Sequence, residues 1–145
     1  MFRGQFNHTV DAKGRVALPS RFRDECSPGL IVTPALFDPC LHVFPLAAWE
    51  ALEEKVAALP SLDPHVVRFR RLYISAACEC EVDKAGRVLV PGHLRQHGRL
   101  ERDVLCAGMG RHFELWSREE WDKALVLDPA EQASFQRAVL EQIKI

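Results

Sequence analysis

Two arginines, Arg15 and Arg87, each follow an aspartate by four residues, in a phrase that the chain contains twice. Residues 10–19 read VDAKGRVALP and residues 82–91 read VDKAGRVLVP, an offset of 72 residues. A guanidinium group presents several N–H donors in one plane, so it can bind a phosphate or the two acceptors on a guanine edge. The alternative is an ion pair between each arginine and its aspartate, which would close the loop. Both can hold together, because the aspartate can fix the arginine rotamer.

The repeated phrase has the pattern of a tight turn between two strands. Apolar and polar residues alternate over residues 6–10 and 78–82, before each turn, and the alternation resumes after it. Gly14 and Gly86 close the two loops, where a residue with positive φ is needed. Each copy is therefore predicted to form a β-hairpin that carries an arginine at its tip.

The rest of each copy predicts a short helix and a second pair of strands. The helices are expected at 20–26 and at 92–97, the latter closed by Gly98; the strands are expected at 30–32, 41–44, 104–106 and 113–116. Further helices are predicted over 45–59, 63–75, 117–125 and 129–143. Four short strands bury too little surface alone, so the two copies should pack together.

These elements predict an α+β fold made of two tandem, duplicated units. The predicted organisation is a first repeat at 5–48, a helical linker at 49–76, a second repeat at 77–120 and a C-terminal helical segment at 121–145.

The charge is arranged in blocks that the net charge of −1 conceals. Residues 1–23 carry five basic and one acidic side chains, and residues 65–102 carry eight basic and four acidic ones. Each basic block contains one copy of the phrase, which favours a polyanionic partner, although solvated surface is the plainer account of any single charge. Lys13 and Lys84 lie near the tips of the two turns, and the first copy also gathers Arg3, Arg21 and Arg23, so the first copy is the stronger candidate for a nucleic-acid face.

Other kinds of chemistry find little support. His93 and His97 have a zinc-binding spacing, but Leu94 stands where a metalloprotease needs glutamate, so exposed histidines are the simpler reading. No catalytic set is visible, so we expect no enzyme, cofactor, metal or small-molecule substrate. Five cysteines without a signal-peptide pattern indicate reduced thiols. No stretch is apolar enough for a membrane span, and a cytoplasmic protein is expected.

The chain resembles the MraZ family, bacterial transcriptional regulators of the SpoVT/AbrB superfamily. The resemblance covers nearly the whole chain and rests on the start MFRG, the paired Asp-x-x-x-Arg motifs at 11–15 and 83–87, and the segments PCL at 39–41, LRQH at 94–97 and FELW at 113–116.

The resemblance implies two AbrB-type units paired in an intertwined β-barrel-like core. It also implies a ring-shaped homo-oligomer, an octamer or larger. Such a protein would bind direct repeats in the double-stranded promoter DNA of its own division and cell-wall operon, usually as a repressor, and would be associated with the nucleoid. The resemblance makes Arg15 and its neighbours on the first turn the expected DNA contacts, with Arg87 as the matching residue of the second copy. The full set of expected contacts is Arg3, Lys13, Gly14, Arg15, Lys84 and Arg87. A different class remains open, an antitoxin-like or other protein-interaction module on the same scaffold.

Overall fold

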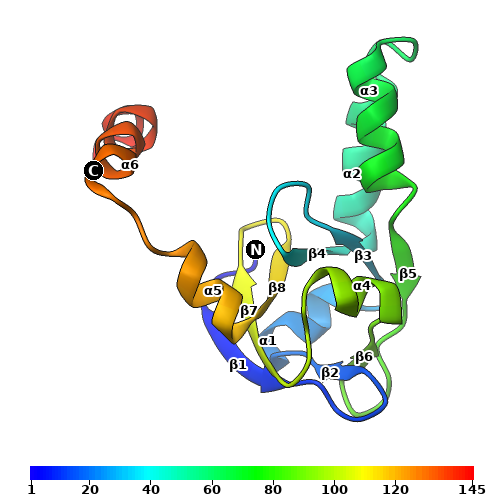
Figure 1. Ribbon diagram of the computed structural model, residues 1–145. Helices are drawn as coiled ribbons and strands as arrows, with labels where there is room; N and C mark the ends of the chain where they lie inside the picture. Colours follow the sequence, from blue (N-terminus) through cyan, green and yellow to red (C-terminus); the bar gives the residue numbers. More distant parts are fainter.

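The computed structural model describes residues 1–145 and shows a mixed α/β architecture (Figure 1). The first copy contains β1 (Gln5–Thr9), β2 (Arg15–Ala17), α1 (Ser20–Arg23), the 3-10 turn η1 (Asp24–Cys26), β3 (Leu30–Pro34) and β4 (Cys40–Pro45). Two helices follow, α2 (Leu46–Ala57) and α3 (Pro64–Phe69), and α3 continues into the π-helical turn η2 (Arg70–Ile74). The second copy contains β5 (Cys78–Cys80), β6 (Arg87–Leu89), α4 (Gly92–His97), β7 (Asp103–Gly108) and β8 (Phe113–Ser117). The chain ends with α5 (Arg118–Ala124), α6 (Pro129–Phe135), the π-helical turn η3 (Gln136–Leu140) and α7 (Glu141–Ile143).

Side-chain caps explain where several helices begin. Asp63 accepts a hydrogen bond from the backbone N–H of His65 at the start of α3, and Ser117 and Asp128 cap α5 and α6 in the same way. Gly98 closes α4, as predicted, with a φ of −80°, and the left-handed residue is Arg99 after it. A glycine at position 98 also leaves room for Leu100, since a Cβ there would lie 3.2 Å from that side chain.

The strands form one six-stranded antiparallel sheet and a separate two-stranded ribbon. The sheet order is β1-β7-β8-β4-β3-β5, and the ribbon pairs β2 with β6. Strands of the two copies therefore alternate as partners: β1 pairs with β7, β3 with β5 and β4 with β8. The copies are intertwined, but no ladder joins the edge strands β1 and β5, so the expected closed barrel is not shown.

The predicted hairpins are present only as tight turns. Each turn is closed by one bridge, Val10 with Val16 and Val82 with Val88, and then the strands diverge toward the other copy. The simple hairpin prediction was wrong in this respect. A short hairpin alone buries one face poorly, whereas exchange of strands places the apolar positions of both copies in one core.

An approximate two-fold relation links the copies. Val16 opposes Val88 in the ribbon, and His42 opposes Glu114 in the sheet; both pairs are separated by the repeat offset. The largest cluster of buried residues lies between the sheet and the ribbon and includes Val16 and Val88. Figure 1 shows α1 and α4 beside the ribbon, with α2 and α3 at the opposite end of the molecule. The ribbon is thus the outer layer of one face.

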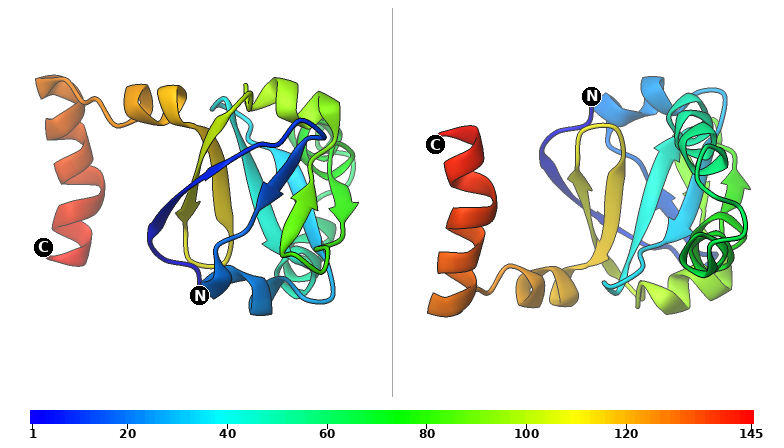
Figure 2. Two further views of the ribbon diagram at one scale, coloured as in Figure 1. Left: turned by 90° about the horizontal axis from the view of Figure 1, so that it is seen from below. Right: turned by 90° about the horizontal axis from the view of Figure 1, so that it is seen from above.

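The other face of the sheet is covered by helices. A second cluster joins Ile31 and Phe44 of the sheet to Trp49 of α2 and Tyr73 of η2. Trp121 of α5 packs against Trp116, with ring centroids 5.7 Å apart. Beyond α5, the C-terminal helix stands clear of the body in both views of Figure 2. None of the helices combines the length and the apolar character of a membrane span.

Candidate nucleic-acid interface

The first turn is organised by the carboxylate of Asp11. One oxygen, Oδ1, accepts the backbone N–H groups of Lys13 and Arg15, at 2.9 and 3.0 Å. The other, Oδ2, accepts the side-chain Nε–H of Arg15 at 2.7 Å. Gly14 has a φ of +84°, as predicted for the loop-closing residue. The aspartate therefore shapes the turn and fixes the arginine at the same time.

The second turn repeats this geometry. Asp83 accepts the backbone N–H groups of Ala85 and Arg87, both at 2.9 Å, and the Nε–H of Arg87 at 3.0 Å. The φ of Gly86 is +77°. The ion-pair alternative is thus confirmed in both copies. It leaves the terminal Nη groups of both arginines without a protein hydrogen-bond partner, so the guanidinium edge that would face a nucleic acid remains available.

Hydrogen bonds also explain the acidity of both carboxyl groups. The backbone N–H of Arg15, followed by its side chain and the N–H of Lys13, lowers the pKa of Asp11 to about 2. The backbone N–H and side chain of Arg87 lower the pKa of Asp83 in the same way. Both aspartates are therefore ionised at neutral pH and carry the charge that each ion pair requires.

Arg15 and Arg87 lie on one outer face of the β2–β6 ribbon. In the ladder Val16 pairs with Val88, and both side chains are buried in the core. Because side chains alternate along a strand, the residues on either side of each valine point outward. These outward positions hold Arg15, Ala17, Arg87 and Leu89. A two-stranded ribbon is one of the elements that the major groove of B-DNA admits.

The arginines of α1 and α4 brace the turns across the two copies. Arg95 of the second copy lies over Gly14, and Arg23 of the first copy lies over Gly86. Arg23 donates its Nε–H to the carbonyl of Leu18 at 3.1 Å, and Arg95 does the same to Val90. Arg23 and Arg95 are separated by the repeat offset of 72 residues, but this offset does not reveal that each side chain lies over the turn of the other copy.

The structure brings some of the predicted contact residues together and leaves one apart. Lys13 and Lys84 are exposed in the two turns that flank the ribbon. Gly14 is buried beneath Arg95, so only its backbone could contact a nucleic acid. Arg3 is exposed, but β1 separates it from the first turn, and its backbone lies beside Gly108 at the end of β7. Arg3 is thus the predicted contact that is not gathered at the ribbon.

A polar cluster that sequence reasoning missed lies at the centre of the sheet. The Nε2 of His42 is 3.1 Å from Oε2 of Glu114, and the Nδ1 of His42 is 2.5 Å from the hydroxyl of Tyr73. Trp116 donates to the other oxygen of Glu114 at 2.9 Å, and the Cys40 thiol contacts Oε2 at 3.8 Å. The one available signal was that residues 42 and 114 occupy the same position in the two copies.

The donors of Cys40, His42 and Glu114 are close enough to be considered as metal ligands, within 4.8 Å of one another. They already satisfy one another by hydrogen bonding. Burial raises the pKa of Glu114, but hydrogen bonds from His42 and Trp116 outweigh it and leave the pKa below its usual value. Burial raises the pKa of the Cys40 thiol. The cluster is therefore read as a hydrogen-bonded network.

The histidines considered as zinc ligands contact different groups. The Nε2 of His97 lies 3.3 Å from the backbone oxygen of Asp38, whereas that of His93 lies 3.9 Å from the Cys78 thiol. All five cysteines are free thiols. No group of three potential ligands includes His93 or His97.

Comparisons with known proteins identify the family. A family model described as "MraZ protein, putative antitoxin-like" matches twice, over residues 1–72 and 73–142. The chain belongs to the MraZ family. The two matches divide the chain between its two copies, so the duplication seen in the strand pairing is also a property of MraZ sequences. Each copy supplies one of the Asp-x-x-x-Arg turns of the ribbon.

Several curated MraZ relatives are similar over most of their length. A protein of Carboxydothermus hydrogenoformans is 48% identical over 122 residues, which is 84% of this chain and 85% of the relative. One from Heliobacterium modesticaldum is 47% identical over 85% of each chain, and one from Limosilactobacillus fermentum is 44% identical over 83% of this chain and 84% of the relative. All three are named transcriptional regulator MraZ.

Proposed function

We propose that this protein is a sequence-specific, DNA-binding transcriptional regulator, and that the outer face of the β2–β6 ribbon is its DNA-binding surface. The observation that carries the proposal is the pair Arg15 and Arg87. Each is held by its own aspartate through Nε, with the terminal Nη groups unbonded. A side chain fixed in this way loses little conformational entropy when it binds.

The ribbon face has the features expected of a groove reader. Each arginine can bind the O6 and N7 acceptors of a guanine, which discriminates against a wrong base by about 1–3 kcal/mol. Lys13 and Lys84, in the turns at either end, are the proposed phosphate contacts. The backbone of Gly14 and the side chain of Arg3 complete the proposed contact set; Arg3 would meet DNA only where the duplex continues past the ribbon. Asp11 and Asp83 add specificity for the position of the duplex, because each carboxylate repels a phosphate that is not bound by the neighbouring arginine.

The proposed target is a set of direct repeats in the promoter of the protein's own division and cell-wall operon, where binding represses transcription. A single subunit offers few phosphate contacts, so its affinity should be modest and strongly dependent on salt. A ring-shaped homo-oligomer, an octamer or larger, would present several ribbons to several repeats and gain through effective concentration. This function places the protein in the cytoplasm, on the nucleoid, and needs no cofactor, metal or catalytic residue.

The deciding experiment is a fluorescence anisotropy titration. The ligands are the duplex immediately upstream of the gene and a shuffled duplex, at two salt concentrations, with wild type and Arg15→Ala. We expect a preference for the upstream duplex that falls at least tenfold in the variant. Arg118→Ala is the matched control, because Arg118 bonds Asn7 and Asp122 away from the ribbon and should keep full affinity. Equal binding of both duplexes by wild type would overturn the proposal.

A second candidate is an antitoxin-like protein-interaction module. It is favoured by the description of the family model and by the exposed C-terminal helix. Affinity purification of the tagged protein from its native host separates the two candidates. A stoichiometric unrelated protein that co-purifies and competes with the upstream duplex would support the module. Its absence, together with specific DNA binding, would leave the regulator.

A further inference from the structure

The last twenty residues form an arm with an uncovered apolar stripe. The C-terminal arm (residues 126–145) contains one continuous helix made of α6, η3 and α7. Phe135, Val139 and Ile143 recur every four residues, so they lie on one face of this helix, and they are 46%, 41% and 56% exposed. The arm has no buried residue. A lone helix of this length is marginal in water, so the stripe needs a partner.

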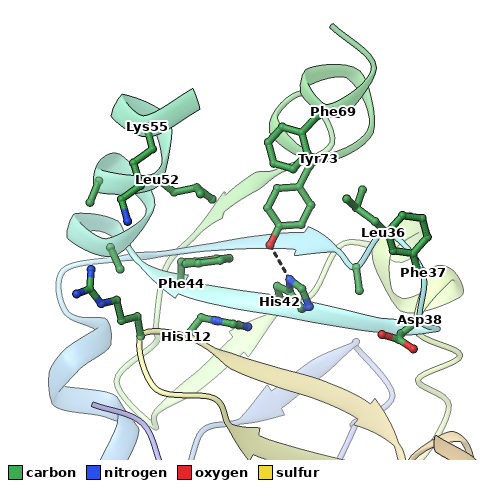
Figure 3. Close-up of a pocket in the computed structure, with 14 residues that line it drawn as sticks. Leu36, Phe37, Asp38, His42, Phe44, Leu52, Lys55, Phe69, Tyr73 and His112 are labelled. Atoms are coloured by element: carbon green, nitrogen blue, oxygen red, sulfur yellow. Dashed lines mark hydrogen bonds between the residues drawn. The ribbon is translucent and has the colours of Figure 1, made fainter. Parts of the chain in front are cut away.

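A groove with the matching character lies between α2 and η2. Figure 3 shows it walled by Leu52 and Lys55 of α2 on one side and by Phe69 and Tyr73 on the other, with Phe44 and His42 on its floor. The hollow measures about 510 Å³. Phe37, at its rim, is 96% exposed, which is unusual for so large an apolar side chain. The small residues Ala48 and Ala51 line the α2 wall and let another helix approach closely.

The charges of the arm and the groove are complementary. Lys55 and Asp38 lie on opposite sides of the hollow, and neither side chain forms an ion pair within the chain (Figure 3). On the arm, Glu131 lies one turn before Phe135 on the striped face, and Lys144 follows Ile143 at the other end. An arm with Glu131 near Lys55 and Lys144 near Asp38 would satisfy both pairs. Arg111 also lines the groove, so the hollow carries more positive than negative charge. The positions of Lys55 and Asp38 favour one direction for a helix docked there.

The positions of arm and groove indicate that the partner is a second copy of this chain. In Figures 1 and 2 the arm projects from one side of the molecule, and α2 and α3 lie on the other. The linker between α5 and α6 has four residues and spans at most about 14 Å, less than the diameter of a body of this size. A patch and a complementary groove on opposite sides make a head-to-tail contact, which closes into a ring when the rotation permits.

We propose that the C-terminal arm of one copy docks, through Phe135, Val139 and Ile143, into the α2–η2 groove of the next copy. This is the helix-in-groove mode of recognition. The contact gives a structural basis to the oligomer proposed above and rests on that part of the proposed function, but not on DNA binding. The groove faces away from the ribbon, so docking leaves Arg15 and Arg87 free.

The test uses two full-length variants that each lose one half of the contact. Val139→Asp places a charge in the apolar stripe, and Ala51→Glu places one in the groove; both positions are exposed, so the fold should survive. The matched controls are Ala133→Asp, on the opposite face of the arm, and Ala57→Glu, which is exposed on the face of α2 opposite the groove. Mass is measured by size-exclusion chromatography with light scattering, and folding by circular dichroism.

We expect wild type and both controls to be oligomers, and each test variant to be monomeric. A mixture of the two test variants retains one intact arm and one intact groove, so it should form a 1:1 dimer and nothing larger. Test variants that keep the wild-type mass, or a mixture that stays monomeric, would overturn the docking proposal alone. A monomeric wild type would overturn both the docking and the ring. Neither result bears on Arg15, which is tested separately with DNA.

Charge exchange provides an independent check of direction. Lys55→Glu should weaken the oligomer and Glu131→Lys should weaken it similarly, whereas the double variant should regain at least part of the lost association. Failure of the double variant to recover any association would contradict the direction assigned to the arm.

Discussion

The guanidinium of Arg95 lies directly over Gly14, across the boundary between the two copies. A Cβ atom added at Gly14 would lie 2.6 Å from Cζ of Arg95, and one at Gly86 would lie 2.4 Å from Cζ of Arg23. Each turn of the ribbon is therefore closed partly by its own aspartate and partly by an arginine of the other copy. Each copy therefore contributes one arginine to the turn of the other.

Gly14→Ala should destabilise the protein by about 1–3 kcal/mol, because a positive φ costs an L-residue 1–2 kcal/mol and the new methyl must displace Arg95. The free energy of unfolding is measured by urea denaturation. Gly29→Ala is the matched control: its backbone is ordinary, and the nearest atom to the added Cβ is 3.5 Å away. Combining Gly14→Ala with Arg95→Ala should recover the steric part of the loss. Equal effects at Gly14 and Gly29 would mean that the turn is not constrained.

The partnering of strands is the part of the fold that the sequence could not determine. The turns at Gly14 and Gly86, most helix boundaries and the duplication follow from local patterns, and the structure confirms them. Alternation, however, fixes only which face of a strand is apolar. The strands of the two copies carry similar patterns, so β1 could have paired within its own copy as well as with β7. That choice depends on packing over the whole core, which local spacing does not encode.

The candidate site was predicted in part for the same reason. Arg15 and Asp11 are four residues apart, and a tight turn brings them together on local grounds. Arg95 on Gly14 and His42 beside Glu114 are long-range contacts, and each depends on the intertwined pairing. The repeat offset marked these residues as equivalent, but equivalence does not reveal contact.

The loss of folding stability at acidic pH should depend on Asp11. Its pKa is about 2 in the folded protein and about 3.9 in an unfolded chain, so the folded state binds the proton less tightly. Its contribution to stability is then complete above about pH 4 and is lost as the pH falls toward 2. Urea midpoints at pH 5, 4 and 3 should show wild type and Asp11→Asn converging as the pH falls. A gap between them that is constant with pH would show that the carboxylate charge is not responsible.

Removal of the Tyr73 hydroxyl should destabilise the sheet without changing DNA binding. Tyr73→Phe keeps the ring but leaves Nδ1 of the half-buried His42 without its partner, which costs about 1–3 kcal/mol. Ser75→Ala removes a comparable hydroxyl two residues further on, where it is exposed, and should cost less than about 0.5 kcal/mol. Urea denaturation measures both. A change in affinity for a single-repeat duplex would contradict the separation of this cluster from the ribbon.

Arg87→Ala should weaken DNA binding about as much as Arg15→Ala, because the two arginines occupy equivalent outward positions on one ribbon face. The measurement is the anisotropy titration on a duplex with one repeat, over a series of salt concentrations. If Arg87 reads a base, the difference in binding free energy between the specific and the shuffled duplex should shrink by about 1–3 kcal/mol. The slope of log affinity against log salt concentration should then change little. If it binds a phosphate, both affinities should fall together and the slope should decrease by about 0.9. Full affinity in Arg87→Ala would confine the interface to the first turn and leave the second turn as the brace that Arg23 completes.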